Sequence, residues 1–277
     1  MISELHAHST ASDGTLPPSE LVARAAGFGV EVLSITDHDS VEGLADARDA
    51  CRAARITFVT GVELSAVHDG RDVHILGYFM DSSDEALLAH LTDLRAARRR
   101  RAETIVHALQ EAGYAVSLDD VLAFSEGGAI GRSHVARALV AGGHAEDVTD
   151  AFRRLLGRGR PFYVPKDVRS PLDAIEVITD AGGIAVLAHP GITGIDDVIP
   201  ELADQGLAGV EAFHADHTPE QRLRYKRLSE ELGLLVTGGS DYHGPEAPNP
   251  ELGSVELPDG ALDRFLSAGG AHRHADD

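Results

Sequence analysis

The chain has 277 residues, of which 43% are hydrophobic and 25% charged, as is usual for a soluble globular protein large enough to bury a substantial core. Its 24 basic and 45 acidic residues give a formal net charge of −21, which disfavours non-specific binding to nucleic acid or to a membrane surface. No apolar run reaches the length of about eighteen residues that predicts a membrane-spanning helix. The single cysteine, Cys51, excludes an intramolecular disulfide framework and a cysteine-rich zinc site, and we expect a cytoplasmic protein.

The first third of the sequence alternates between strand and helix patterns. Apolar runs bounded by turn residues predict strands, and amphipathic segments predict helices. In chain order these elements are a short apolar start ending at residues 4–6, a helix at 17–27, a strand at 30–37, a helix at 43–55, and strands at 57–65 and 73–80.

The last part of the sequence alternates in the same way. Ser170 and Asp173 have the spacing of a capping box, with Pro171 at the first helical position, and Thr218 and Pro219 repeat this signature. The predicted elements are a helix at 171–181, a strand at 184–190, a helix at 195–205, a strand at 209–215, a helix from about residue 219, and a strand at 234–243. Such alternation predicts an α/β protein with a mainly parallel sheet, either open or closed into a barrel.

The middle of the chain carries almost no strand pattern. Leucines at 87, 88, 91 and 94 are expected on one face of a helix, and apolar residues at 105, 106 and 109 continue this face. We therefore predict a helical insertion at 84–165 within a discontinuous α/β domain at 1–83 and 166–265, followed by a disordered tail at 266–277. The arginine run at 98–101 is interpreted as a solvated face of the first inserted helix.

Histidines and carboxylates gather near the ends of the predicted strands. His6 and His8 are two residues apart, so both side chains leave the same side of an extended segment and can bind one metal ion; Asp241 and His243 repeat this spacing. The other members are Asp13, His38, Glu63, His74, His189 and His214. The carboxyl ends of parallel strands meet on one face, and so dense a cluster needs cations to balance it. We therefore predict a polynuclear centre of Mn, Fe(II) or Zn.

Several segments together resemble one known family. ELHAHSTASDGT, LSITDHDS, TGVELS, VLAHP and GGSDYHG resemble the motifs of the PHP (polymerase and histidinol phosphatase) family, in the same order along the chain. VHILGYF and GRSHVARAL, with the helical insertion, resemble the small bacterial members that act on nucleotide phosphoesters. The resemblance implies a distorted (β/α)7 barrel of PHP type that holds two to three divalent metal ions.

The resemblance also implies which residues bind each ion. His6, His8, Glu63 and Asp241 would hold the first, Glu63 would bridge to a second that His74 and His134 complete, and Asp13, His38 and His243 would hold the third. Asp13 stands where many family members have a histidine, and an aspartate is also a suitable ligand for such an ion. Because His134 lies in the insertion, the insertion would fold over the barrel mouth as a lid.

Four side chains are candidates for contact with a phosphorylated substrate. Arg132 can make bidentate contacts with a phosphate, and Lys166 can meet a second one. His189 and His214 are candidate catalytic residues that would protonate the leaving group, and His189 is also a candidate phosphate contact. Their alternative role is to orient the metal ligands.

The leading functional hypothesis is a metal-dependent phosphoesterase. Attack of metal-bound hydroxide on phosphorus would release phosphate from a small phosphomonoester, such as a nucleoside 3′,5′-bisphosphate or an AMP-like nucleotide. A 5′-3′ exoribonuclease acting on short RNA is the main alternative, and neither a membrane nor a long duplex is an expected partner. An amidohydrolase acting on a C–N bond is less favoured, because neither Lys166 nor Lys226 lies on a predicted strand. The complete ligand set argues against a non-catalytic metal or polymerase-interaction module.

Overall fold

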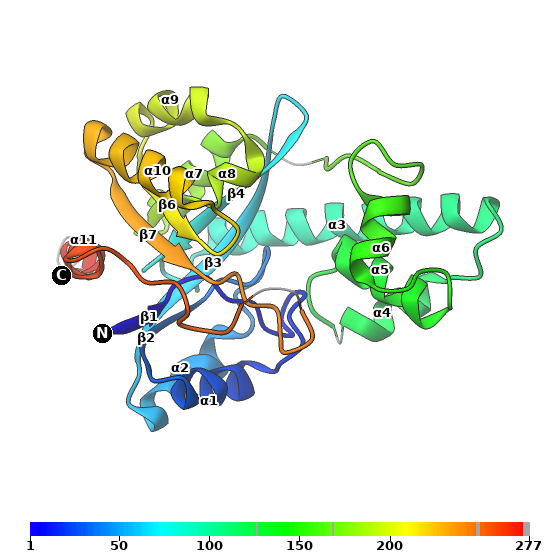
Figure 1. Ribbon diagram of the computed structural model, residues 1–277, viewed down its shortest axis with the longest axis horizontal. Coiled ribbons are helices and arrows are strands. Elements are labelled where there is room, and N and C mark those ends of the chain that lie inside the picture. The colour runs from blue at the N-terminus through cyan, green and yellow to red at the C-terminus, as the bar shows by residue number, and fades with distance from the viewer. Residues whose placement is uncertain (126, 168, 248–249, 274–277) are drawn as a thin grey trace.

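One curved sheet of seven strands, arranged in chain order, forms the centre of the barrel in the computed structural model (Figure 1). The structure describes residues 1–125, 127–167, 169–247 and 250–273. The strands are β1 (Ile2–Glu4), β2 (Val30–Ile35), β3 (Thr57–His68), β4 (Arg71–Tyr78), β5 (Ile184–Leu187), β6 (Leu207–His214) and β7 (Leu235–Gly239). A bridge between Ala7 and Tyr242 joins the chain after β1 to the chain after β7. The sheet is thus nearly closed, which confirms the predicted distorted barrel.

β4 is the one strand of this sheet that runs against its neighbours. It is antiparallel to both β3 and β5, whereas the other neighbouring strands are parallel. The cause is the two-residue turn Asp69–Gly70, in which both residues have positive φ (47° and 69°), as a tight hairpin requires. Both strands continue up to this turn, beyond their predicted bounds. The hairpin register places Ser65 opposite His74, with Glu63 one pair further along the same face.

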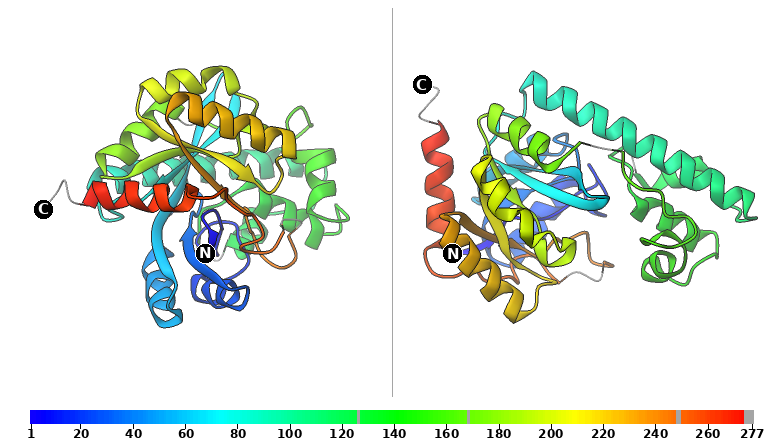
Figure 2. Two further views of the ribbon diagram at one scale, coloured as in Figure 1. Left: turned by 60° about the vertical axis from the view of Figure 1, so that its left-hand side comes forward. Right: turned by 90° about the horizontal axis from the view of Figure 1, so that it is seen from above.

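Helices cover the outside of the barrel (Figure 2). They are α1 (Pro18–Gly27), α2 (Leu44–Ala54), α7 (Pro171–Asp180), α8 (Pro190–Thr193), α9 (Ile199–Asp204) and α10 (Pro219–Leu232). The two predicted capping boxes are present, since Ser170 accepts from the N–H of Asp173 and Thr218 accepts from the N–H of Gln221. The helix predicted at 195–205 begins later, because a 3-10 turn, η2 (Asp196–Val198), precedes α9.

The inserted helices are α3 (Glu85–Glu111), α4 (Leu118–Ser125), α5 (Arg132–Ala141), α6 (Val148–Ala151) and the π-helical η1 (Phe152–Leu156). The first half of α3 packs Leu87 and Leu91 into the barrel core. Its second half packs Leu109 into a separate core with Val121 and Leu139. Figure 1 shows α3 leaving the barrel, with α4, α5 and α6 beside its far half. This long helix therefore connects the two hydrophobic cores.

The chain ends in the helix α11 (Ala261–Arg273), in which Phe265 packs edge-on against Tyr78 with ring centroids 5.0 Å apart. The predicted disordered tail is therefore wrong for residues 266–273, because burial of Phe265 anchors this helix. Residues 274–277 lie outside the described part of the chain. None of the described helices is both long and apolar enough to span a bilayer.

Candidate metal centre

Two fully buried imidazoles that follow β1 begin the site. Nδ1 of His6 lies 2.9 Å from Oε1 of Glu211, and because a carboxylate can only accept, Nδ1 carries the proton. The free Nε2 of His6 then faces Oε2 of Glu63 at 3.5 Å and Oδ1 of Asp241 at 3.4 Å. Nε2 of His8 lies 3.4 Å and 3.0 Å from the same two oxygens.

These atoms converge with separations that suit a shared metal ion. His6 Nε2, His8 Nε2 and Glu63 Oε2 are buried and have no hydrogen-bond partner, although they lie close together. Nitrogen and oxygen donors that bind one ion at roughly 2.0–2.2 Å are themselves about 3 Å apart. The donor set therefore fits a divalent metal ion.

The second oxygen of Glu63 meets two further imidazoles. Oε1 lies 2.9 Å from Nδ1 of His74 and 3.1 Å from Nε2 of His189, and these two nitrogens are 3.3 Å apart. The hairpin register brings His74 to Glu63, and the end of β5 brings His189. The family resemblance implies His134 as the partner of His74 at the second ion, and in the structure the imidazole beside His74 and Glu63 is that of His189.

His134 has a different environment. Its Nδ1 accepts the backbone N–H of Gly131 at 2.9 Å and so caps α5, which leaves the proton of the neutral ring on Nε2. Burial lowers the pKa of His134 to about 4, so the ring is neutral. Nε2 is buried without a hydrogen-bond partner, and His134 belongs to none of the ligand clusters found among the described residues. In this geometry His134 presents an N–H donor, and its role as a ligand of the second ion stays a prediction.

A third cluster is contiguous with the first. Atoms of His8, Asp13, His38 and His243 all lie within 4.8 Å of one another. Oδ1 of Asp13 is 3.3 Å from Nε2 of His243, and Nδ1 of His38 is 2.9 Å from Oε2 of Glu63. The three predicted ligands of the third ion are therefore side by side. The other clusters that could hold an ion are His6, His8 and Asp241; His38, Glu63 and His74; and His6, Glu211 and His214.

The carboxylates of the centre are ionised despite their burial. Burial alone would raise the pKa of Glu63, but His38, His74 and His6 bring it well below its usual value. Burial alone would also raise the pKa values of Asp13 and Asp241, but the neighbouring histidines hold both pKa values well below the usual range. The centre therefore combines ionised oxygens with imidazoles, the ligand set predicted from the sequence.

Three further buried carboxylates hold the ligand segments in place. Glu211 binds the ring of His6 and also accepts the backbone N–H of His189 at 2.9 Å. Asp37 accepts from both the N–H and the hydroxyl of Ser9, at 2.7 and 2.6 Å, and Glu4 fixes the loop after β7 through Ser240. No role was predicted for these carboxylates. Acidic residues within otherwise apolar strand segments were the available signal.

The other two predicted substrate residues, Arg132 and Lys166, both contact protein side chains. Nη2 of Arg132 donates to Asp72 at 3.0 Å, and the guanidinium lies over the ring of Tyr163 at 5.4 Å. Nζ of Lys166 is 2.8 Å from Nε2 of His74, and burial lowers the pKa of Lys166 to about 8. Lys166 therefore contacts a residue of the centre, whereas Arg132 contacts Asp72 and Tyr163.

His214 also has the geometry of a donor. Its Nδ1 accepts the backbone N–H of Asp216 at 3.1 Å, so the proton of the neutral ring is on Nε2, 3.5 Å from Oδ2 of Asp241. Such an imidazole is placed to orient a ligand carboxylate or to donate a proton.

The arginine run at 98–101 is not uniformly solvated, contrary to its predicted place on an exposed helix face. The side chains of Arg98 and Arg101 are only 11% exposed, whereas Arg99 is 54% exposed. Arg101 donates to the carbonyl of Val164 at 2.7 Å. Residues three apart on α3 face the barrel and the returning chain, which buries two of the four arginines.

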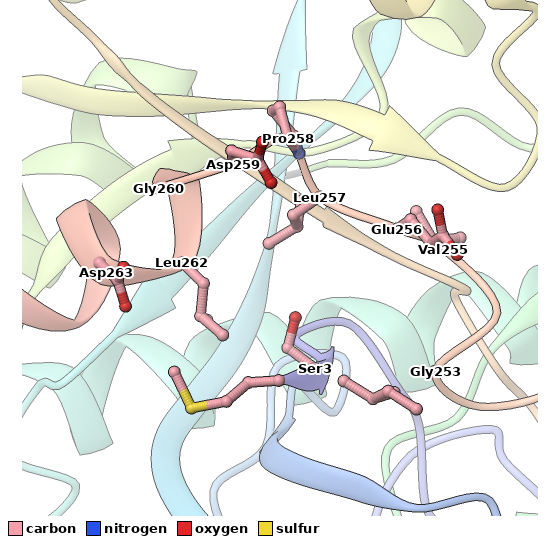
Figure 3. Close-up of a pocket in the computed structure, with 12 residues that line it drawn as sticks. Ser3, Gly253, Val255, Glu256, Leu257, Pro258, Asp259, Gly260, Leu262 and Asp263 are labelled. Atoms are coloured by element: carbon pink, nitrogen blue, oxygen red, sulfur yellow. The ribbon is translucent and has the colours of Figure 1, made fainter.

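A cavity of about 380 Å³ lies at the other end of the barrel (Figure 3). It is lined by the start of β1, including Ser3, and by residues 253–263, including Leu257 and Leu262. The histidines follow the carboxyl end of β1, whereas this cavity borders its beginning. It is therefore separate from the metal centre.

Comparison with known proteins places these features in one family. Residues 4–159 match the family model described as PHP domain. A relative from Haemophilus influenzae named 5'-3' exoribonuclease is 38% identical over 247 residues, which are 87% of this chain and 90% of that protein. A relative from Chromobacterium violaceum named 3',5'-nucleoside bisphosphate phosphatase is 36% identical over 259 residues, which are 91% of each chain.

A solved structure from Bifidobacterium adolescentis, described as a candidate metal-dependent phosphoesterase, has a similar fold. It is 34% identical in sequence and superposes with a TM-score of 0.89 over 95% of each chain. The similarity therefore extends over the barrel and the insertion together.

Proposed function

This chain belongs to the PHP-domain family of phosphoester hydrolases, and we propose that it releases phosphate from a small nucleotide, such as a nucleoside 3′,5′-bisphosphate. The observation that carries the proposal is the convergence of unpartnered imidazole nitrogens and carboxylate oxygens around Glu63. The relative named 3',5'-nucleoside bisphosphate phosphatase supports the choice of substrate class.

We assign the ligands in three overlapping groups. His6, His8, Glu63 and Asp241 would hold the first ion; Glu63, His74 and His189 would hold the second; and Asp13, His38 and His243 would hold the third. The distances around Glu63 support the first two groups, and the cluster around Asp13 supports the third. Nitrogen and oxygen ligands suit Mn, Fe(II) or Zn.

Bound divalent ions would supply positive charge for the phosphate and would lower the pKa of a water molecule. This local charge accounts for anion binding by a protein of net charge −21. Glu211 fixes the ring of His6 so that Nε2 faces the centre, and Asp37 fixes the turn that carries Asp13.

The inserted helices supply donors from outside the barrel. His134 offers a neutral Nε2–H to a phosphate oxygen, which fits its buried and unpartnered state. Arg132 offers a guanidinium that Asp72 orients, and Lys166 adds a second cation. His214 holds a proton on Nε2 beside Asp241 and is placed to pass it to the leaving group.

A 5′-3′ exoribonuclease acting on short RNA is the second candidate function. The relative named 5'-3' exoribonuclease and the cations Arg101 and Arg132, which both lie over the ring of Tyr163, favour it. C–N hydrolysis has less support, because Lys166 approaches His74 from a segment outside the strands. The single buried Cys51 suits action in the cytoplasm.

A substrate panel tests the proposal. The protein, loaded with Mn(II), would be given a nucleoside 3′,5′-bisphosphate, a nucleoside monophosphate, a 5′-phosphorylated trinucleotide and an amide, with phosphate and nucleotide release measured separately. We expect inorganic phosphate from the bisphosphate at the highest kcat/KM. Release of mononucleotides from the trinucleotide without free phosphate would favour the exonuclease, and cleavage of the amide alone would contradict both.

A further inference from the structure

Arg98 projects from α3 into the junction between the insertion and the barrel. Its Nε donates to Oδ2 of Asp39, its Nη2 donates to the hydroxyl of Ser65 at 2.8 Å, and its Nη1 reaches the carbonyl of Ile130 at 3.5 Å. The side chain is 11% exposed and Asp39 is fully buried. One guanidinium thus contacts three segments that are far apart in the sequence.

Two of these segments carry residues of the metal centre. Asp39 follows His38, and its backbone N–H donates to the carbonyl of Glu63 at 3.0 Å. Ser65 lies two residues after Glu63 and is paired with His74 across the hairpin.

The third segment belongs to the lid. Ile130 precedes Gly131, whose N–H donates to Nδ1 of His134. Arg98 therefore joins the segments of His38 and Glu63 on the barrel to the turn that presents His134.

The conformation of Asp39 indicates that this junction holds the backbone in a specific geometry. Asp39 has a φ of +51°, in the left-handed region that residues other than glycine rarely adopt. Its Oδ1 accepts the N–H of Ser65 at 2.7 Å while its Oδ2 binds Arg98. These contacts fix the residue next to His38 in a conformation that it would otherwise seldom occupy.

We propose that Arg98 is a positioning residue for the hydrolytic reaction. It holds the lid and the segments of His38 and Glu63 in a fixed arrangement relative to one another. The inference rests on the proposed phosphoesterase function. Arg98 acts through the segments that it holds, because its Nε, Nη1 and Nη2 each contact an acceptor of a different segment. The planar guanidinium reaches three acceptors at once, whereas an ammonium group is a single point charge on a flexible stem.

Replacement of Arg98 tests the proposal against the simpler role of neutralising Asp39. Arg98→Ala leaves a buried carboxylate unpaired and destabilises the fold, so the decisive variant is Arg98→Met combined with Asp39→Asn, which removes both charges together. We expect this double variant to fold and to lose about a hundredfold in kcat/KM for the bisphosphate, as small displacements of reacting groups do. Arg98→Lys keeps the charge but lacks the planar guanidinium, so its kcat/KM should be only slightly higher than that of the double variant.

The matched control is Arg95→Ala. Arg95 lies one turn earlier on α3 and pairs with Glu42 of the barrel, at 2.9 Å, but both side chains are much more exposed. This variant should keep kcat/KM within about twofold, as expected for loss of an exposed pair.

Hydrogen exchange of the metal-free protein supplies a readout that does not depend on activity. In the Arg98→Met, Asp39→Asn protein, amides near residues 65 and 131 should exchange faster together, while in Arg95→Ala they should not. Wild-type kcat/KM or unchanged exchange at residues 65 and 131 in the double variant would overturn the inference. Failure of the wild-type protein to release phosphate would instead reject the proposed function, and the exchange data would still test the junction.

Discussion

Asp72 accepts a hydrogen bond of 3.0 Å from Nη2 of Arg132, so the guanidinium proposed to meet the substrate is already oriented by a carboxylate. Asp72 lies on β4 and Arg132 begins α5, so this ion pair also connects the barrel with the insertion. Two separable functions are therefore proposed for Arg132, to bind phosphate and to hold the insertion against the barrel.

Replacement of Arg132 distinguishes these functions. Arg132→Ala should leave metal content unchanged and lower kcat/KM by about 2–4 kcal/mol, or roughly thirty- to a thousandfold, since a charge-assisted contact is lost. Asp72→Asn removes the ion pair but keeps the guanidinium, and it should cost much less. Equal losses in both variants would mean that Arg132 acts through Asp72 and not through phosphate.

Comparison of a bisphosphate with a simple monophosphate locates the contact of Arg132. If Arg132 binds a phosphate remote from the scissile bond, Arg132→Ala should impair hydrolysis of the bisphosphate far more than that of the monophosphate. Steady-state kinetics on both substrates measure the difference. Arg132→Lys should restore activity only in part, since it lacks the bidentate fork.

Glu63 should matter more than Asp13 for metal content. Both oxygens of Glu63 face imidazoles of the centre, whereas Asp13 contributes to the third cluster alone. Elemental analysis of protein purified without chelator should give at least two divalent ions per chain, a larger loss in Glu63→Gln and a smaller one in Asp13→Asn. Fewer than one ion in the wild-type protein would contradict the metal assignment.

His189 and His134 should respond in opposite ways to replacement by alanine. His189→Ala should lower the metal content, because its Nε2 lies within 3.3 Å of both Glu63 and His74 atoms. His134→Ala should keep the metal content and lower kcat, because a phosphate donor is removed. Loss of an ion in His134→Ala with none in His189→Ala would restore the assignment that the family resemblance implies.

Most of the barrel and most of the centre could be predicted from the sequence, because both depend on local patterns. His6, His8, Glu63 and Asp241 lie in or just after apolar runs of the sequence. Because parallel strands bring their carboxyl ends together, these residues are predicted to meet at one site. The reversal of β4 depends on the Asp69–Gly70 hairpin, and the apolar pattern of the strands carries no sign of it.

Residues that act through long-range contacts could not be predicted in the same way. Glu211 binds His6 across 205 residues of sequence, and Arg98 binds Asp39 across 59. The role of His134 could not be predicted for a different reason. It depends on which ring nitrogen accepts the N–H of Gly131, and in the structure this is Nδ1. Spacing along the chain carries no information about that choice.

The turn after β1 should be sensitive to loss of Asp37. Its carboxylate accepts three hydrogen bonds from Ser9 and Ser12, all of them buried. Asp37→Ala should therefore lower the free energy of unfolding by about 3 kcal/mol, measured by urea denaturation, because buried donors lose their acceptor. The control Asp49→Ala, at an exposed residue paired with Arg52, should change it by less than about 0.5 kcal/mol. Similar values for both variants would show that Asp37 does not stabilise the turn.

The most direct test of the account is the rate of inorganic phosphate release from a nucleoside 3′,5′-bisphosphate by protein stripped with a chelator and then supplied with Mn(II). The ligand atoms around Glu63 predict that the stripped protein is inactive, that Mn(II) restores release, and that Glu63→Gln remains inactive in the same metal. Phosphate release by the stripped protein at the rate of the loaded one, or full activity of Glu63→Gln, would contradict a hydrolysis that depends on this centre.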